Sequence, residues 1–186
     1  MLLLWGVVLG VAIGFARGGT IANLENIDLS YIWLVPLSLV IQLLIFPLFA
    51  EQPVVPVGTG ILHVLSYIIL AFFVLANLKV WGMPLMGAGM AANLLAITAN
   101  GGYMPASPGS LLKAGEIEVA YHLIRKGTYG NVINMNGSNA FEFLGDWLYL
   151  PGWFPFSTAF SLGDLLVVLG LLFFFGAGMR KREELA

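Results

Sequence analysis

The stretch ILHVLSYIILAFFVLANL, residues 61–78, decides the fold class of this chain because it contains no charged side chain. About 20 apolar residues in a helix cross the roughly 30 Å hydrocarbon core of a bilayer, so a run of this length predicts a membrane-spanning helix. Further charge-free runs flank it at residues 1–16, 31–50, 80–99 and 165–179. We therefore expect an all-α polytopic membrane protein with about five transmembrane helices, forming a single membrane domain over residues 1–186.

The composition supports lipid as the main solvent. Of 186 residues, 59% are apolar and 10% are charged, compared with about 25% charged in an ordinary soluble domain. The mean hydropathy is +0.91. A net charge of −2 argues against a nucleic-acid binder, which needs a basic face. The absence of cysteine excludes disulfides and thiolate metal sites, and the two histidines, His63 and His122, are too far apart in sequence to indicate a metal site.

The basic residues predict how the spans are oriented. Arg17, Lys79 and the cluster at residues 180–182 fall on one side of five spans, and Glu51 falls on the other. Cytoplasmic loops carry the excess of Lys and Arg, so we expect the C-terminus in the cytoplasm and the N-terminus outside. Residues 1–16 lack the basic n-region and the cleavage site of a signal peptide, which favours a retained helix.

The external segment, residues 100–164, is too long for a simple connection and should carry structure of its own. Residues 110–126 have a mixed helical period, with Ser110 as the N-cap and Gly127 as the stop, which predicts one amphipathic or interfacial helix. Residues 131–139 are rich in Asn and Gly and predict turns. The aromatic, proline-broken residues 141–160 favour the headgroup belt of the membrane.

Four glycines recur at every fourth position along the first run and just beyond it: Gly6, Gly10, Gly14 and Gly18. A stripe of small residues lets two helix backbones approach closely in a membrane. We expect its mate to be another helix of this chain, with the small residues at 87–92 as the natural partner. The alternative is a second subunit.

His63 is the residue in the spans that would suit a cofactor. It shares a helix face with Ser66 and Tyr67, and an imidazole there is a candidate axial ligand for haem or a chlorophyll-type pigment. The ordinary interpretation is an interhelical hydrogen bond, because a polar group in lipid needs a partner. The sequence requires no cofactor.

Asp146 and Asp164 are the candidate catalytic residues. Asp164 opens the last span, where the free N–H groups and the dipole of a helix N-terminus stabilise a carboxylate. Asp146 lies 18 residues earlier on the same predicted side of the membrane. Two carboxyl groups that meet at one spot can share a proton and activate a water molecule, as in aspartic proteases.

A set of short motifs is spread over essentially the whole chain. They are Arg17-Gly18-Gly19, the stretch from Trp33-Leu34 to Gln42, Ser66-Tyr67, Asn100-Gly101-Gly102-Tyr103-Met104-Pro105, Leu144-Gly145-Asp146 and Ser161-Leu162-Gly163-Asp164. Together they resemble the bacterial membrane proteins of domain of unknown function 5317, and the Asn-Gly-Gly-x-Met-Pro string is the most specific part. The resemblance implies a multi-pass protein of the bacterial cytoplasmic (inner) membrane and no established activity.

The C-terminal third is also similar to the lipoprotein signal peptidases. Gly130-Asn131-Val132-Ile133-Asn134, then Asp146, then Phe160-Ser161-Leu162-Gly163-Asp164 follow the order of that family's motifs. Asn134 and Met135 stand where the family has Asp and Arg, Ser161 stands where it has Asn, and the number of spans differs. Carried over, Asp146 and Asp164 would be the catalytic dyad.

Three functions follow from these features. The first is a small integral membrane subunit that packs with other membrane proteins in an energy-transducing or photosynthetic complex and holds lipid, quinone or a porphyrin-type pigment. The second is an intramembrane aspartic hydrolase that uses Asp146 and Asp164. The third is a transporter or lipid-handling protein. The absence of buried charge in the spans and the absence of an inverted repeat argue against this third function.

Overall fold

The computed structural model describes residues 2–46, 54–55 and 57–180. The end of the second charge-free run, Glu51, and the basic residues Lys181 and Arg182 lie outside the described residues.

The chain is mostly helical, and its five long apolar helices coincide with the five charge-free runs. They are α1 (Leu2–Ala16), α2 (Leu34–Ile45), α3 (Thr59–Ala76), α4 (Met83–Ala99) and α7 (Leu162–Gly178). Among the described residues α3 is the one helix long and apolar enough to cross a membrane, and the other four are shorter apolar helices. At 1.5 Å per residue, the 18 residues of α3 span about 27 Å, close to the thickness of a hydrocarbon core.

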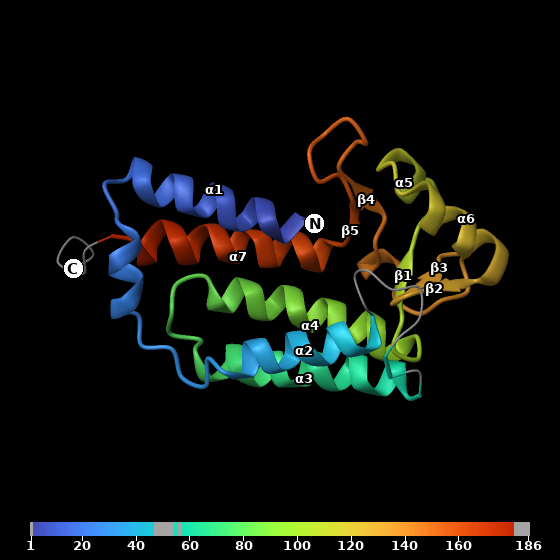
Figure 1. The fold of residues 1–186 in the computed structure, drawn as a ribbon, viewed down its shortest axis with the longest axis horizontal. Helices are drawn as coiled ribbons and strands as arrows, with labels where there is room; N and C mark the ends of the chain where they lie inside the picture. The colour runs from blue at the N-terminus through green and yellow to red at the C-terminus, as the bar shows by residue number, and fades with distance from the viewer. Residues whose placement is uncertain (1, 47–53, 56, 181–186) are drawn as a thin grey trace.

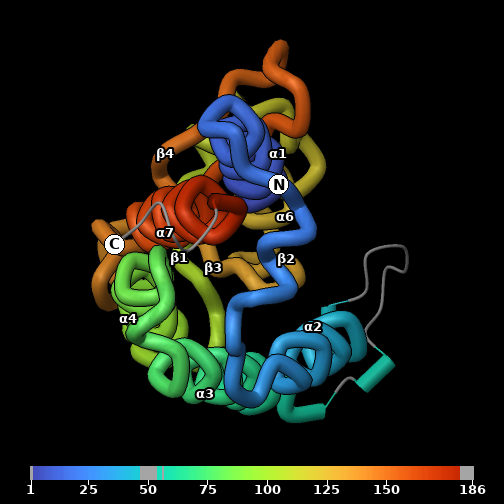
Figure 2. Tube along the Cα trace, turned by 90° about the vertical axis from the view of Figure 1, so that its left-hand side faces the viewer, coloured from blue at the N-terminus to red at the C-terminus, as the bar shows by residue number. Residues whose placement is uncertain are grey.

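The five helices run along the long axis of the molecule and form an arc in the order α1, α7, α4, α3, α2 (Figures 1 and 2). The ends of α1 and α7, the 3-10 helix η1 (Ile21–Asn26) and the turn between α3 and α4 lie at one end of the bundle, on the left of Figure 1. The segment between α4 and α7 lies at the other end, together with the start of α1.

Glycine allows the helices of the arc to approach closely. Gly6, Gly10 and Gly14 are buried against α7. A Cβ added at Gly10 would lie 3.1 Å from both the Leu171 carbonyl oxygen and Phe175 Cβ. The mate of α1 is therefore α7 and not the small residues 87–92 of α4.

Gly18 differs from the other glycines of the stripe. It is exposed, has a φ of +76°, and has nothing within 4 Å of an added Cβ. It lies just beyond the end of α1, so it serves the turn and not a helix contact.

The segment between α4 and α7 forms a small cap on the bundle. It contains β1 (Met104–Ala106), α5 (Pro108–Lys113), α6 (Ile117–Lys126), β2 (Thr128–Tyr129), β3 (Val132–Asn134), the 3-10 helix η2 (Glu142–Leu144), β4 (Leu148–Tyr149) and β5 (Ala159–Phe160). Strand β3 is the centre of a three-stranded sheet, parallel to β1 and antiparallel to β2, while β4 and β5 form an antiparallel pair.

Two expectations for this cap were wrong. Residues 110–126 form two helices, because the chain turns at Gly115 with a φ of +82°. Ser107, and not Ser110, caps the first of them by accepting a hydrogen bond from the Ser110 backbone N–H, and the stop at Gly127 is as predicted. Residues 131–139 are not all turn, since β3 lies within them and pairs on both sides.

Candidate functional site

Backbone pairing fixes Asp146 where the cap meets the bundle. The Asp146 backbone N–H donates to the Pro105 carbonyl at 2.8 Å, and its carbonyl accepts from the Ser107 N–H at 3.0 Å, which attaches it to the buried strand β1. Gly145 is needed beside it, because an added Cβ would clash with the Pro105 carbonyl oxygen. Asp146 therefore depends on a strand that lies 40 residues earlier in the chain.

Asp164 is held at the start of α7 by its own helix cap and by α4. The Asp164 N–H donates to Ser161 Oγ at 2.9 Å, and the Ser161 N–H donates to Asp164 Oδ2 at 3.2 Å, which makes a reciprocal capping box. Asn93 of α4 donates from Nδ2 to Asp164 Oδ1 at 2.7 Å. Both carboxylate oxygens of Asp164 thus accept a hydrogen bond.

Asn93 connects these groups and was not selected by the sequence reasoning as a site residue. Its side chain is 4% exposed, and its Oδ1 accepts a hydrogen bond from Ser161 Oγ at 2.9 Å. Gly163 makes room for it, because an added Cβ there would clash with Asn93 Oδ1. The signal in the sequence was a carboxamide inside a charge-free run, which has to find partners within the protein.

Asp146 has the most perturbed environment of the cap. Its Oδ1 is buried and has no hydrogen-bond partner among the described residues, although the residue as a whole is half-buried. Burial raises the pKa of its carboxyl well above the usual range, and the nearby charges of Asp164 and then Glu116 raise it further. The charge of Asp164 therefore acts on Asp146, whose carboxyl group holds its proton more tightly than that of an exposed Asp.

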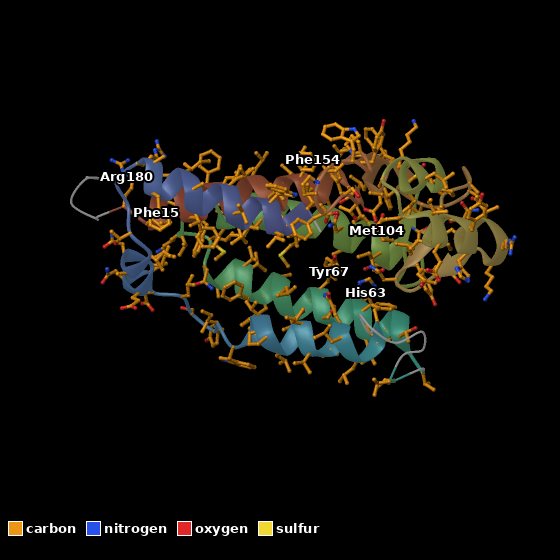
Figure 3. All side chains as sticks on the ribbon, turned by 45° about the horizontal axis from the view of Figure 1, so that its top comes forward. Phe15, His63, Tyr67, Met104, Phe154 and Arg180 are labelled. Carbon is orange, nitrogen blue, oxygen red and sulfur yellow. The ribbon has the colours of Figure 1, made fainter. Side chains whose placement is uncertain are left out.

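Tyr67 of α3 lies on the bundle side of this pair. It interacts with Asn93 and is within electrostatic range of Asp164 and Asp146. It also packs against the buried cluster of Ala96, Ile97 and Met104. Figure 3 shows Tyr67 and Met104 near the junction of the helices and the cap.

His63 lies one turn from Tyr67 and is held by protein groups. Its Nδ1 lies 2.7 Å from the Gly102 carbonyl oxygen, which can only accept, so Nδ1 carries the proton. The rings of Phe46 and Tyr67 meet the imidazole edge-on at 5.0 and 5.4 Å. His63 is thus a packed side chain that ties α3 to the loop after α4, and its use as a cofactor ligand stays a prediction.

The carboxyl groups of Asp164 and Glu116 act electrostatically on Asp146 at this junction. Glu116 is itself engaged, because its side chain accepts hydrogen bonds from Thr158 Oγ1 at 3.2 Å and from the Ala159 N–H at 3.1 Å. Within the described ranges no group of three or more His, Cys, Asp or Glu residues is placed to hold a metal ion. We call the set Tyr67, Asn93, Asp146, Ser161 and Asp164 the junction site.

The fold and the junction site define a helical, apolar protein with a carboxyl pair under a small cap. The family model described as a family of unknown function (DUF5317) matches residues 26–176, and the chain belongs to this family. This confirms the resemblance carried by the sequence motifs. No curated protein and no solved structure matches the chain, and the likeness to lipoprotein signal peptidases stays a prediction.

Proposed function

We propose that this protein lies in the bacterial cytoplasmic membrane with all five long helices in the bilayer. The support is the apolar surface that they leave uncovered. Leu39 of α2, Phe72 of α3 and Phe173 of α7 are each more than half exposed. Monomeric soluble proteins rarely expose continuous apolar surface of this extent, whereas lipid covers it at no cost.

The proposed orientation places the cap outside and the C-terminus in the cytoplasm. Arg17, the turn with Lys79, and Arg180 lie at the same end of the bundle, opposite the cap (Figures 1 and 3). This grouping follows the positive-inside rule. The cap then lies at the outer headgroup level, where its aromatic loop, including the exposed Trp153 and Phe156, is favoured.

The function that the junction site supports best is an aspartic hydrolase acting on a membrane-embedded or lipid-anchored substrate. One observation carries it: Asp146 has a buried, unpartnered oxygen and a raised pKa beside Asp164, whose oxygens accept from Asn93 and Ser161. When two neighbouring carboxyl groups differ in pKa, the one with the higher pKa can act as the acid and the other as the base.

The proposed step divides the work between the two aspartates. A water molecule attacks the carbonyl carbon of the scissile bond while the Asp164 carboxylate takes a proton from that water. Asp146 donates its proton to the leaving nitrogen or oxygen as the bond to carbon breaks, which releases an acid and an amine or alcohol. Proton transfer from Asp164 to Asp146 through a second water restores the starting state.

The test uses the full chain in mixed micelles with a panel of diacylglycerol-anchored and transmembrane peptides. Hydrolysis in ¹⁸O-water is expected to place one ¹⁸O in the product carboxyl group. Asp146→Asn and Asp164→Asn are each expected to slow the reaction by about 10²- to 10⁴-fold, the usual range for one acid or base. Asp28→Asn, which removes an exposed carboxyl group from the segment between η1 and α2, is the matched control.

A second readout requires no substrate. Isotope-edited infrared spectra at pH 7 are expected to contain a protonated carboxyl band that Asp146→Asn removes. If that band is absent from the wild type, or if Asp164→Asn hydrolyses the panel at the wild-type rate, the proposed reaction is wrong.

A non-enzymatic subunit of a larger membrane complex is the second candidate, and α2 favours it. This helix packs mainly against α3, at the end of the arc, and leaves Leu39 and Val40 exposed. A photo-crosslinking residue at position 39 is expected to capture another membrane protein in native membranes if this candidate holds. Crosslinks to lipid alone contradict it.

A further inference from the structure

A second region of interest lies at the end of the bundle opposite the junction site. A cleft of about 370 Å³ opens between the turn that joins α3 to α4 and the outer side of α7. We call it the turn cleft, and its lining includes Leu78, Lys79, Val80, Trp81, Leu85 and Phe173. Its volume lies within the range of small-ligand clefts.

The turn that forms the cleft is held in place by buried polar contacts. Asn77 donates from Nδ2 to the carbonyl oxygens of Ser30 at 2.9 Å and Phe73 at 2.7 Å, and its Oδ1 accepts from the Ser30 N–H at 2.9 Å. Gly82 brings the turn against the backbone of α7, because an added Cβ would clash with the Gly170 carbonyl oxygen. The cleft is therefore preformed and does not need a ligand to order it.

Its lining is apolar except for one cation. Trp81 and Phe173 remain more than half exposed beside it. Lys79 is exposed, and its ammonium group has no ion-pair partner among the described residues. An apolar cleft with a single cation on its lining matches an amphiphile whose head is anionic and whose tail is hydrocarbon.

We propose that the turn cleft binds an anionic phospholipid of the inner leaflet, with its phosphate at Lys79 and an acyl chain along Leu85 and Phe173. This inference rests on the membrane placement proposed above, which puts this end of the bundle at the cytoplasmic surface. Trp81 then lies at the depth where indole rings are favoured. Arg17 and Arg180 at the same end add to the local attraction for anionic lipid.

The test measures quenching of Trp81 by brominated lipids. The full chain is reconstituted in bilayers of phosphatidylcholine and phosphatidylglycerol in which one or the other carries brominated acyl chains at the same mole fraction. The Trp81 signal is the difference between the wild type and Trp81→Phe. One lysine near the surface predicts about a fivefold preference for phosphatidylglycerol at this site.

Lys79→Gln is expected to reduce that preference to parity, whereas Lys126→Gln, an exposed lysine of the cap, is expected to keep it. Equal quenching by both lipids in the wild type overturns the proposed site while leaving the membrane placement intact. Quenching by neither lipid overturns the membrane placement itself. Loss of the preference on adding inorganic phosphate overturns the proposal by pointing to a water-soluble anion as the occupant.

Discussion

Replacing Asp146 by Asn is expected to remove a loss of stability that its buried carboxyl group causes as the pH rises. Burial, followed by the charges of Asp164 and Glu116, raises the pKa of Asp146 in the folded state. The folded state then binds the proton more tightly than the unfolded state, so stability is full at low pH. It falls as the pH rises from about 3.9, the ordinary value for Asp, toward the raised value.

The magnitude follows from linkage. One group contributes a slope of up to about 1.4 kcal/mol per pH unit inside that window, and nothing beyond it. The asparagine side chain has nearly the same size and no proton to lose, so the Asp146→Asn protein lacks this slope. The variant is therefore expected to gain stability relative to the wild type as the pH rises, even though it lacks the carboxyl group that donates the proton in the proposed reaction.

The assay is unfolding of the full chain by SDS in mixed micelles between pH 5 and pH 8. The quantity of interest is the difference in free energy of unfolding between variant and wild type at each pH, since other titrating groups cancel in it. Asp28→Asn, which removes one exposed carboxyl group, is measured beside it as the matched control. The reasoning would be refuted if the difference in free energy of unfolding between Asp146→Asn and the wild type did not change with pH. It would also be refuted if the wild type became more stable relative to the variant as the pH rises.

Three further predictions concern packing and the junction site. Gly10→Leu is expected to destabilise the protein by about 1–3 kcal/mol by overpacking the α1–α7 contact, while Val8→Leu on the exposed face changes little in the same SDS titration. Asn93→Leu removes the donor to Asp164 Oδ1 and is expected to cost about 1.5–3 kcal/mol, a loss that an unchanged SDS midpoint would contradict. Ser161→Ala removes the cap of α7 and is expected to cost about 1 kcal/mol, measured by the same titration or by earlier hydrogen exchange in the first turn of α7.

The positions of the long helices could be predicted from the sequence because they depend on local composition. A charge-free run is a property of consecutive residues, and all five runs became apolar helices. The capping role expected for Asp164 was equally local, since Ser161 lies three residues before it and forms the reciprocal cap. That all five helices cross a membrane remains part of the proposal.

The junction site could be predicted only in part from the sequence. The two aspartates were selected as a pair, but Asn93 was not, because its importance comes from the approach of α4 to α7 and from the room that Gly163 leaves. The raised pKa of Asp146 likewise depends on its burial beside β1 and on charges from Asp164 and Glu116. Such contacts link residues tens of positions apart, and no local pattern encodes them.

By itself, the sequence determined the apolar character of the protein, the location of its long helices and its family, because each follows from residue type and short motifs. Only the tertiary structure decided that α1 packs on α7, that residues 110–126 break at Gly115, and that Asp146 is attached to β1. The physical reason is that these features depend on which surfaces fit at close range. A glycine stripe predicts a close contact with another helix, but which helix makes that contact depends on how all the helices of the arc pack together.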